Sequence, residues 1–256
     1  MQTKLGIFKP KLLLFLAFSV FIFTPSVTGA TADFSVNEAF LHLSTGRYEI
    51  AFERKTGGLI HILDLKHDKF LSRNQDSAQL WGATFTDGKQ ILSPAYQGSF
   101  TYKWNSLFQS LTLHYKGTAA LPLDVTIEIR PRNEQCLQLQ AKITNNSPVP
   151  IQTFQFPTGI KVATDEIRDA LLPMIPGVRL QSAFFTDRKS FSGQYPGVMF
   201  ADYVALRTDH SCLALYSQQQ GRGLTVPQPV QIGFSALPHF GWTRLVHDFK
   251  TWIGTE

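Results

Sequence analysis

Hydrophobic and polar residues alternate most regularly within residues 121–160. Every second residue from Val125 to Ile129 is aliphatic, and the residues between them are Thr and Glu. The pattern returns from Leu137 to Ile143, where Gln and Lys alternate with aliphatic residues. A period of two residues predicts strands that have one buried face and one solvated face.

Turn signals separate these segments. Pro131–Glu134 interrupts the first alternation and predicts a hairpin loop. Asn145–Pro148 ends the second segment with turn residues, and a third strand is expected at Ile151–Phe156. The sequence therefore predicts an antiparallel meander of three strands.

The rest of the chain shows the same alternation of hydrophobic and polar residues, interrupted by turn signals. Gly46–Phe52 and Leu59–Leu65 predict a hairpin around the glycine turn Lys55–Gly58. Further strands are expected at 78–85, 100–104, 111–115, 198–206, 212–216 and 230–234. Helical character is limited to 164–170 and 243–252, and 173–197 is expected to be an irregular loop. Roughly ten to twelve short strands predict an all-β sandwich or barrel.

The N-terminus has the features of a secretory signal peptide. Lys4, Lys9 and Lys11 precede the apolar run Leu12–Phe23, and Ala30–Ala32 has the small-x-small cleavage pattern. We expect cleavage after residue 32 and a secreted or periplasmic protein. The run is shorter than the roughly 20 residues of a membrane span, although an uncleaved anchor is the alternative. No membrane span is expected in the mature chain.

Removal of this leader changes the charge balance. The net charge falls from +5 to +2, because 21 basic and 19 acidic residues remain in 224 residues. No dense basic patch is left, which argues against a nucleic-acid partner. A single domain of this size can bury a full core.

Most familiar catalytic and cofactor motifs are absent. The sequence has no Gly-x-Ser-x-Gly elbow, no glycine-rich phosphate loop and no zinc pattern of cysteines, so no cofactor is expected. Cys136 and Cys212 could pair in an exported protein or could both be buried thiols.

Two sets of polar residues were considered as sites. His61, Asp64, His67 and Asp68 could form a metal cluster, but polar strand positions that run into a turn explain them better, so no metal site is predicted. The strand carboxylates lie on the polar side of the alternation, which favours solvated positions over catalysis. These carboxylates are Glu49, Glu53, Asp124 and Glu128.

Aromatic residues give the best binding candidates. They gather at 96–104 and at 184–195, where aromatic faces could stack on sugar rings, although core packing is the more common role. Charged residues accompany the second group in a long loop, a common place for binding residues. The residues predicted to bind substrate are Tyr96, Trp104, Arg188 and Tyr195.

The order of these motifs resembles the galactose-mutarotase-like β-sandwich that precedes a catalytic (β/α)8 barrel in several secreted glycoside-hydrolase-like families. The likeness covers most of residues 44–252 and rests on Gly46–Phe52, Thr56–Asp64, Leu80-Trp81 with Phe85, Leu139–Asn146 and Tyr195-Pro196-Gly197. It implies a large two-sheet antiparallel supersandwich over 33–240, and a linker helix that starts within 241–256. Stand-alone mutarotases use a histidine and a glutamate, but neither falls on a matching motif here, so no catalytic residue is assigned.

Three hypotheses of function follow. The first is an exported, non-catalytic module that binds saccharide and accompanies a C-terminal or separate (β/α)8 catalytic domain. The second is an enzyme, either aldose epimerase-like or a glycosidase that needs the barrel. The third is a surface or periplasmic interaction module without a sugar ligand. Fold alone does not decide among them.

Overall fold

A computed structural model describes residues 31–74, 78–134, 136–162, 166–173, 177–186, 191–195, 203–217, 230–234, 240–244 and 248–254. Only the backbone is described for 94, 186, 191–195, 203–204, 215–217 and the last three ranges. Residues 1–30 of the predicted signal peptide lie outside the described residues, so export and cleavage stay predictions. No helix among the described residues has the length and apolar character needed to cross a membrane.

A five-stranded antiparallel sheet opens the fold, in the order β1-β2-β3-β4-β5. Its strands are β1 Asp33–Val36, β2 Phe40–Ser44, β3 Tyr48–Glu53, β4 Leu59–Asp64 and β5 Lys69–Arg73. Strands β3 and β4 form the predicted hairpin, in which Gly57 has a φ of +68°. A side chain at Gly57 would collide with Tyr115 and Phe100, so this turn needs glycine both for its conformation and for its close packing.

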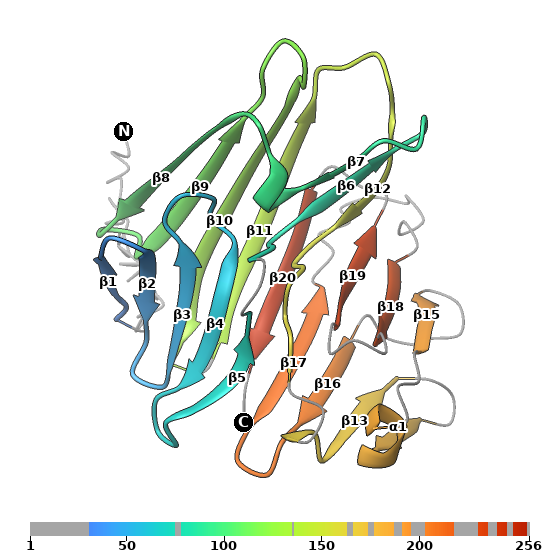
Figure 1. Ribbon diagram of the computed structural model, residues 1–256. Coiled ribbons are helices and arrows are strands. Elements are labelled where there is room, and N and C mark those ends of the chain that lie inside the picture. Colours follow the sequence, from blue (N-terminus) through green and yellow to red (C-terminus); the bar gives the residue numbers. More distant parts are fainter. Residues whose placement is uncertain are drawn as a thin grey trace, which may run out of the picture.

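The largest sheet has nine strands in the order β14-β13-β16-β17-β20-β11-β10-β9-β8, and it crosses the molecule in Figure 1. Its first strands along the chain are β8 Ser99–Asn105, β9 Ser110–Lys116, β10 Leu123–Asn133 and β11 Cys136–Asn145. The later ones are β13 Asp169–Leu172, β14 Val178–Gln181, β16 Tyr203–Arg207, β17 Cys212–Ser217 and β20 Asp248–Gly254.

A third sheet of six strands has the order β15-β18-β19-β12-β6-β7. These strands are β6 Gly82–Phe85, β7 Gln90–Leu92, β12 Ile151–Gln155, β15 Phe191–Tyr195, β18 Val230–Phe234 and β19 Phe240–Arg244. The short helices are η1 Ser93–Ala95 and α1 Ser182–Thr186. The prediction of an almost entirely β fold is confirmed. The two-sheet division is not, because the described strands form three hydrogen-bonded sheets.

One hydrophobic core joins the sheets. Val125, Ile127 and Ile129 are each 0% exposed, as the alternation predicted. Trp81, at the entry to β6, is the largest of the fully buried side chains, and it contacts rings of Tyr115 and Phe154. Burial of such large aromatic surfaces is the main source of stability in a sheet protein of this size.

The predicted meander is wrong in its third strand. Strand β12 pairs with β6 and β19, whereas β11 pairs with β10 and β20. The Asn145 side chain donates to the Val149 carbonyl at 2.8 Å and accepts from the Ser147 amide at 3.0 Å. This local turn carries the chain out of one sheet and into the other.

Several local predictions also need correction. Strand β10 continues to Asn133, and Pro131 pairs with Leu137 beside a register shift, so the expected Pro131–Glu134 loop is mostly a bulged strand. The expected loop 173–197 contains β14, α1 and β15. The expected helical stretches at 164–170 and 243–252 instead contribute to β13, β19 and β20. Pairing within a sheet outweighs weak helical propensity there.

Cys136 and Cys212 do not form a disulfide with each other. Cys136 pairs with Gly254 of β20, and Gly254 pairs on its other side with Ala214 of β17. Strand β20 therefore separates the two cysteines, which puts their Cα atoms beyond the roughly 7 Å that a disulfide can bridge.

Candidate functional site

A polar trough lies on the solvent face of β10 and β11. These are long neighbouring strands of the nine-stranded sheet, between β20 and β9 (Figure 1). In the ladder, Glu128 is opposite Gln140 and Arg130 is opposite Gln138. These four side chains and Arg132 line a hollow of about 180 Å³. The alternation that buries the aliphatic side chains of these strands also places their polar side chains together on the other face.

The chemistry of the trough suits a polyhydroxylated ligand. Carboxamide, carboxylate and guanidinium groups offer donors and acceptors in fixed planes, and vicinal hydroxyls can match them in pairs. Arg130 Nη2 lies 2.5 Å from Glu128 Oε1, so part of the charge is already neutralised.

Some residues of the trough were already predicted to be polar strand positions from the sequence pattern. Glu128, Gln138 and Gln140 were predicted as solvated strand residues, and Glu128 was considered as a catalytic acid. Arg132 was assigned to a loop. Pairing of the two strands gathers these residues. The predicted hairpin pairs the same strands, but its register was missed because the expected loop is mostly a bulged strand.

A second hollow, of about 250 Å³, lies among three turns. Its wall is mostly apolar, with Leu121, Pro122 and Val149 among the lining residues, and Asp87 and Lys89 add charge. None of the predicted binding residues lines it. It is the alternative location for a small amphipathic ligand.

Two of the four predicted binding residues pack on the core. The Tyr96 ring meets Trp81 edge-on at 5.5 Å, and its hydroxyl donates to the Leu123 carbonyl at 2.7 Å. Burial raises the pKa of Tyr96 to about 12. The Trp104 ring stacks on Phe34 at 5.1 Å with an interplanar angle of 17°. Neither residue lines the polar trough.

The other two predicted residues lie elsewhere in the chain. Arg188 is outside the described residues. Tyr195 ends β15, where its backbone pairs with Val230, and its side chain is not described. Their predicted role in saccharide binding therefore stays a prediction.

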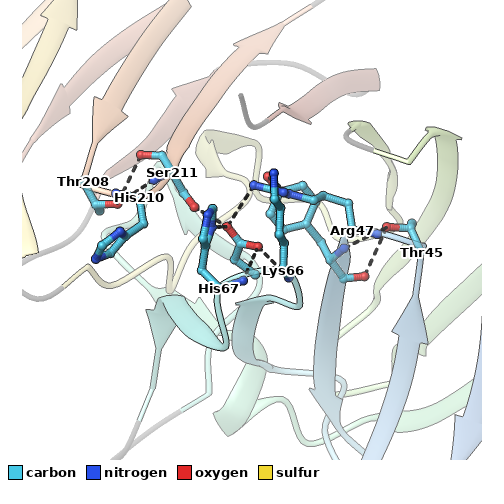
Figure 2. Close-up of polar contacts among 9 residues, drawn as sticks. Thr45, Arg47, Lys66, His67, Thr208, His210 and Ser211 are labelled. Carbon is cyan, nitrogen blue, oxygen red and sulfur yellow. Dashed lines mark hydrogen bonds and ion pairs between the residues drawn. The ribbon is translucent and has the colours of Figure 1, made fainter.

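A buried carboxylate joins the five-stranded sheet to the β16–β17 turn. Asp64 is 0% exposed and accepts hydrogen bonds from Arg47 Nη2 at 3.2 Å, His67 Nδ1 at 2.8 Å and Ser211 Oγ. Figure 2 shows Arg47, His67 and Ser211 converging from three segments. Burial opposes ionisation of Asp64, but hydrogen bonds from Ser211 and His67 outweigh it and lower its pKa.

These contacts also show whether His61, Asp64, His67 and Asp68 could form one metal cluster. His67 bonds to Asp64, whereas His61 lies on β4 and bonds to Glu49 on β3. His61 and His67 therefore belong to separate networks, and the four residues do not converge on one point.

The network of His61 contains a different set of ligand groups. His42, Glu49 and His61 come from the adjacent strands β2, β3 and β4, and their ligand atoms lie within 4.8 Å of one another. Burial opposes ionisation of Glu49, but the hydrogen bond from His61 and the nearby His42 ring outweigh it and lower its pKa. Among the described residues, this is the group that could hold a metal ion.

Asp169 on β13 is a further buried carboxylate. Its side chain is 1% exposed and accepts from Arg207 Nε and Nη2, both at 2.7 Å, and from Arg179 Nε at 2.7 Å. These bonds, mainly those of Arg207, lower the pKa of Asp169 to about 2. The carboxylate therefore links β13 to both of its neighbours in the sheet, β14 and β16.

This pKa predicts acid sensitivity. A folded-state pKa below the unfolded value of about 3.9 gives stability that is complete above that value and is lost as pH falls from about 4 to about 2. We expect Asp169→Asn to cost about 1–2 kcal/mol at pH 7, discounted for the exposed arginines, and the difference from wild type to shrink toward pH 2. Urea unfolding across this pH range measures it. Asp209→Asn, an exposed neighbour, is the control, and a pH-independent difference would contradict the assignment.

Comparison with known proteins gives a fold but no family. No protein-family model matches the sequence, and no curated protein matches it. Among solved structures, the α-N-acetylgalactosaminidase NagBb of Bifidobacterium bifidum in complex with GalNAc matches with a TM-score of 0.62 at 10% identity. The match covers 84% of this chain, which spans only 36% of the length of that enzyme.

Weaker likenesses point to other proteins. A galactose mutarotase-like protein of Lactobacillus casei matches with a TM-score of 0.49 at 10% identity, over 85% of this chain and 100% of that one. The periplasmic domain of Thermotoga maritima YidC matches with a TM-score of 0.44 at 9% identity, over 87% and 85%. Scores below 0.5 support no inference. The chain thus has a β fold that also occurs within a glycosidase.

Proposed function

We propose that this protein is an exported, non-catalytic module that binds saccharide in the trough between β10 and β11. The observation that carries the proposal is the trough itself: five polar side chains, including the opposed pairs Glu128–Gln140 and Arg130–Gln138, on two rigid strands. Side chains fixed by a sheet lose little freedom when a ligand binds, which favours recognition of weakly interacting hydroxyls.

The setting of the module is proposed as well. The leader at residues 1–32 supports export, and the fold shared with part of NagBb supports a carbohydrate-related role beside a (β/α)8 catalytic domain, in the same or another chain. We propose that the five- and six-stranded sheets act together as the second layer of a supersandwich. The support is the single core to which all three sheets contribute.

An epimerase-like enzyme is the competing hypothesis, because a histidine and a glutamate do meet on one sheet. Glu49 and His61, however, are only 2.9 Å apart and bond to each other. Mutarotation needs a base at the anomeric hydroxyl and an acid at the ring oxygen, so the two groups must reach different oxygen atoms of the sugar and not be bonded to each other. This pair therefore favours a role other than epimerisation.

The trough predicts a specific loss of saccharide binding. We expect Gln138→Ala combined with Gln140→Ala to weaken retention on a saccharide array by about tenfold, because two hydrogen-bonding groups are lost. Thr144→Ala, an exposed change on the solvent face of β11 outside the trough, is the matched control and should bind as wild type.

Further variants separate the alternatives. A loss caused by Trp104→Ala or Tyr195→Ala instead would favour the aromatic residues predicted from the sequence. A loss caused by Lys89→Ala would favour the hollow among the turns. If the wild-type protein retains no saccharide, the proposal is wrong and an interaction module without a sugar ligand becomes the better hypothesis. A mutarotation assay on the same protein tests the epimerase hypothesis directly.

A further inference from the structure

We infer that His42, Glu49 and His61 form a binding site for one divalent transition-metal ion, with zinc as the best fit. This inference is independent of the saccharide proposal, because it concerns a different sheet. Strand register, ligand distances, donor types and a second layer of hydrogen bonds support it.

The register of three strands brings the ligands together. His42 of β2 and His61 of β4 are both paired with Ala51 of β3, one on each side. Glu49 lies two residues before Ala51 on β3 and therefore on the same face. The short side chain of Ala51 leaves space above β3, and the two imidazole rings lie over it with centroids 6.3 Å apart.

The distances match a tetrahedral ion. Glu49 Oε1 lies 2.9 Å from His61 Nε2 and 3.2 Å from His42 Nδ1. Zinc with ligand bonds of about 2.0–2.1 Å places neighbouring ligand atoms about 3.3 Å apart, so these two distances need only small shifts. The two imidazole nitrogens lie within 4.8 Å of each other, so they must approach by at most about 1.5 Å to bind one ion. The side chains are 20%, 23% and 14% exposed for His42, Glu49 and His61, which leaves one side open for a water molecule as fourth ligand.

The donor set selects the kind of ion. Two imidazole nitrogens and one carboxylate suit zinc and similar transition metals, whereas calcium and magnesium prefer oxygen ligands throughout. Aromatic edges also restrict the imidazoles: Phe40 meets His42 at 5.8 Å, and Phe70 meets His61 at 5.2 Å, both edge-on. Rings held in this way lose little freedom when they coordinate an ion.

Asn37 influences how strongly the site binds an ion, through its hydrogen bond to His42. Its Oδ1 accepts from the amides of Ala39 and Phe40 at 2.9 and 2.7 Å, which turns its Nδ2 toward His42 Nε2 at 3.1 Å. His42 Nε2 is then an acceptor, which places the ring proton on Nδ1 in the metal-free protein. That buried Nδ1 lies 3.2 Å from Glu49 Oε1 but makes no hydrogen bond. An ion on Nδ1 moves that proton to Nε2, where it faces another donor.

This second layer makes a testable prediction. Asn37→Asp keeps the acceptor for both backbone amides and gives His42 Nε2–H a carboxylate partner, as in carboxylate–histidine–zinc triads. We expect the substitution to tighten zinc binding about tenfold. A purely structural hydrogen-bond network would show no such gain in affinity for the ion.

The experiment titrates zinc into the full-length chain after treatment with a chelator and follows the heat of binding and the thermal midpoint. We expect one ion per chain at this site, a raised midpoint, and at least tenfold weaker binding in Glu49→Gln and His61→Ala. His114→Ala removes an exposed histidine of β9, which bonds to Thr126, and should bind as wild type. Cobalt(II) as a second probe should give the visible spectrum of a tetrahedral site.

Either of two results would overturn the inference. The first is zinc binding that is unchanged in Glu49→Gln and in Asn37→Asp, because the ion would then sit elsewhere. The second is the absence of any binding by wild-type protein at zinc concentrations of about 100 µM, well above those at which a three-ligand protein site should fill. Glu49→Gln preserves the shape of the side chain and should fold as the wild type does. Weaker zinc binding by this variant therefore cannot be attributed to misfolding, as it could be for His61→Ala.

Discussion

Replacing Asp64 with asparagine is expected to lower the free energy of unfolding by about 3–5 kcal/mol. The carboxylate is 0% exposed and accepts from Arg47, His67, Ser211 and two backbone amides, those of Lys66 at 3.0 Å and His67 at 3.3 Å. Asparagine has one acceptor oxygen and a donor group in place of the second, so it leaves Arg47 without its ion pair and turns an N–H₂ toward other donors.

Urea unfolding at neutral pH measures this loss. Asp68→Asn is the matched control, since Asp68 is exposed four residues away and has a φ of +52°, a conformation that asparagine also tolerates. We expect the control to change stability by less than about 0.5 kcal/mol. Similar stability of Asp64→Asn and Asp68→Asn would mean that the Asp64 network does not hold the β4–β5 turn to the β16–β17 turn.

Replacing Trp81 with alanine is expected to cost about 3–5 kcal/mol. The indole is 0% exposed and lies at the meeting point of two sheets, edge-on to Tyr96 and Tyr115 and stacked on Phe154 at 5.9 Å. Alanine would leave a cavity that the surrounding strands cannot close, because each is fixed by its hydrogen-bonded neighbours.

Trp104→Ala provides the comparison for this prediction. Trp104 is only partly buried and packs at the edge of the core against Phe34, so its removal should cost clearly less than removal of Trp81. Trp81→Phe should recover part of the loss, because a smaller aromatic ring refills part of the site. Equal losses for Trp81→Ala and Trp104→Ala would show that the core is not centred where these contacts place it.

The alternation of hydrophobic and polar residues predicted strands and core residues correctly where the nearest neighbours along a strand decide burial. It identified β10, β11 and the β3–β4 hairpin, and it assigned Val125, Ile127 and Ile129 to the core. It failed at 243–252, where β19 and β20 take the place of the expected helix. A short amphipathic segment takes its form from the partner it finds, and here β20 lies between β11 and β17.

The candidate sites were less predictable than the strands. Glu49 and His61 were both considered from the sequence, but as a separate carboxylate and as a member of a different cluster. Register alone places His42 and His61 on either side of Ala51. Likewise, Ser211 lies 147 residues from Asp64, and no local pattern could have paired them.

The amino-acid sequence by itself determined the regularly alternating strands, such as β10 and β11, and which side of them is buried, because a two-residue period fixes both locally. Outside the predicted hairpins, only the tertiary structure decided which strands are neighbours, how they divide among three sheets, and which polar side chains meet across them. The physical reason is that strand pairing satisfies backbone hydrogen bonds between distant segments. Any strand with a compatible apolar face can supply that partner, so the choice depends on how the whole core packs.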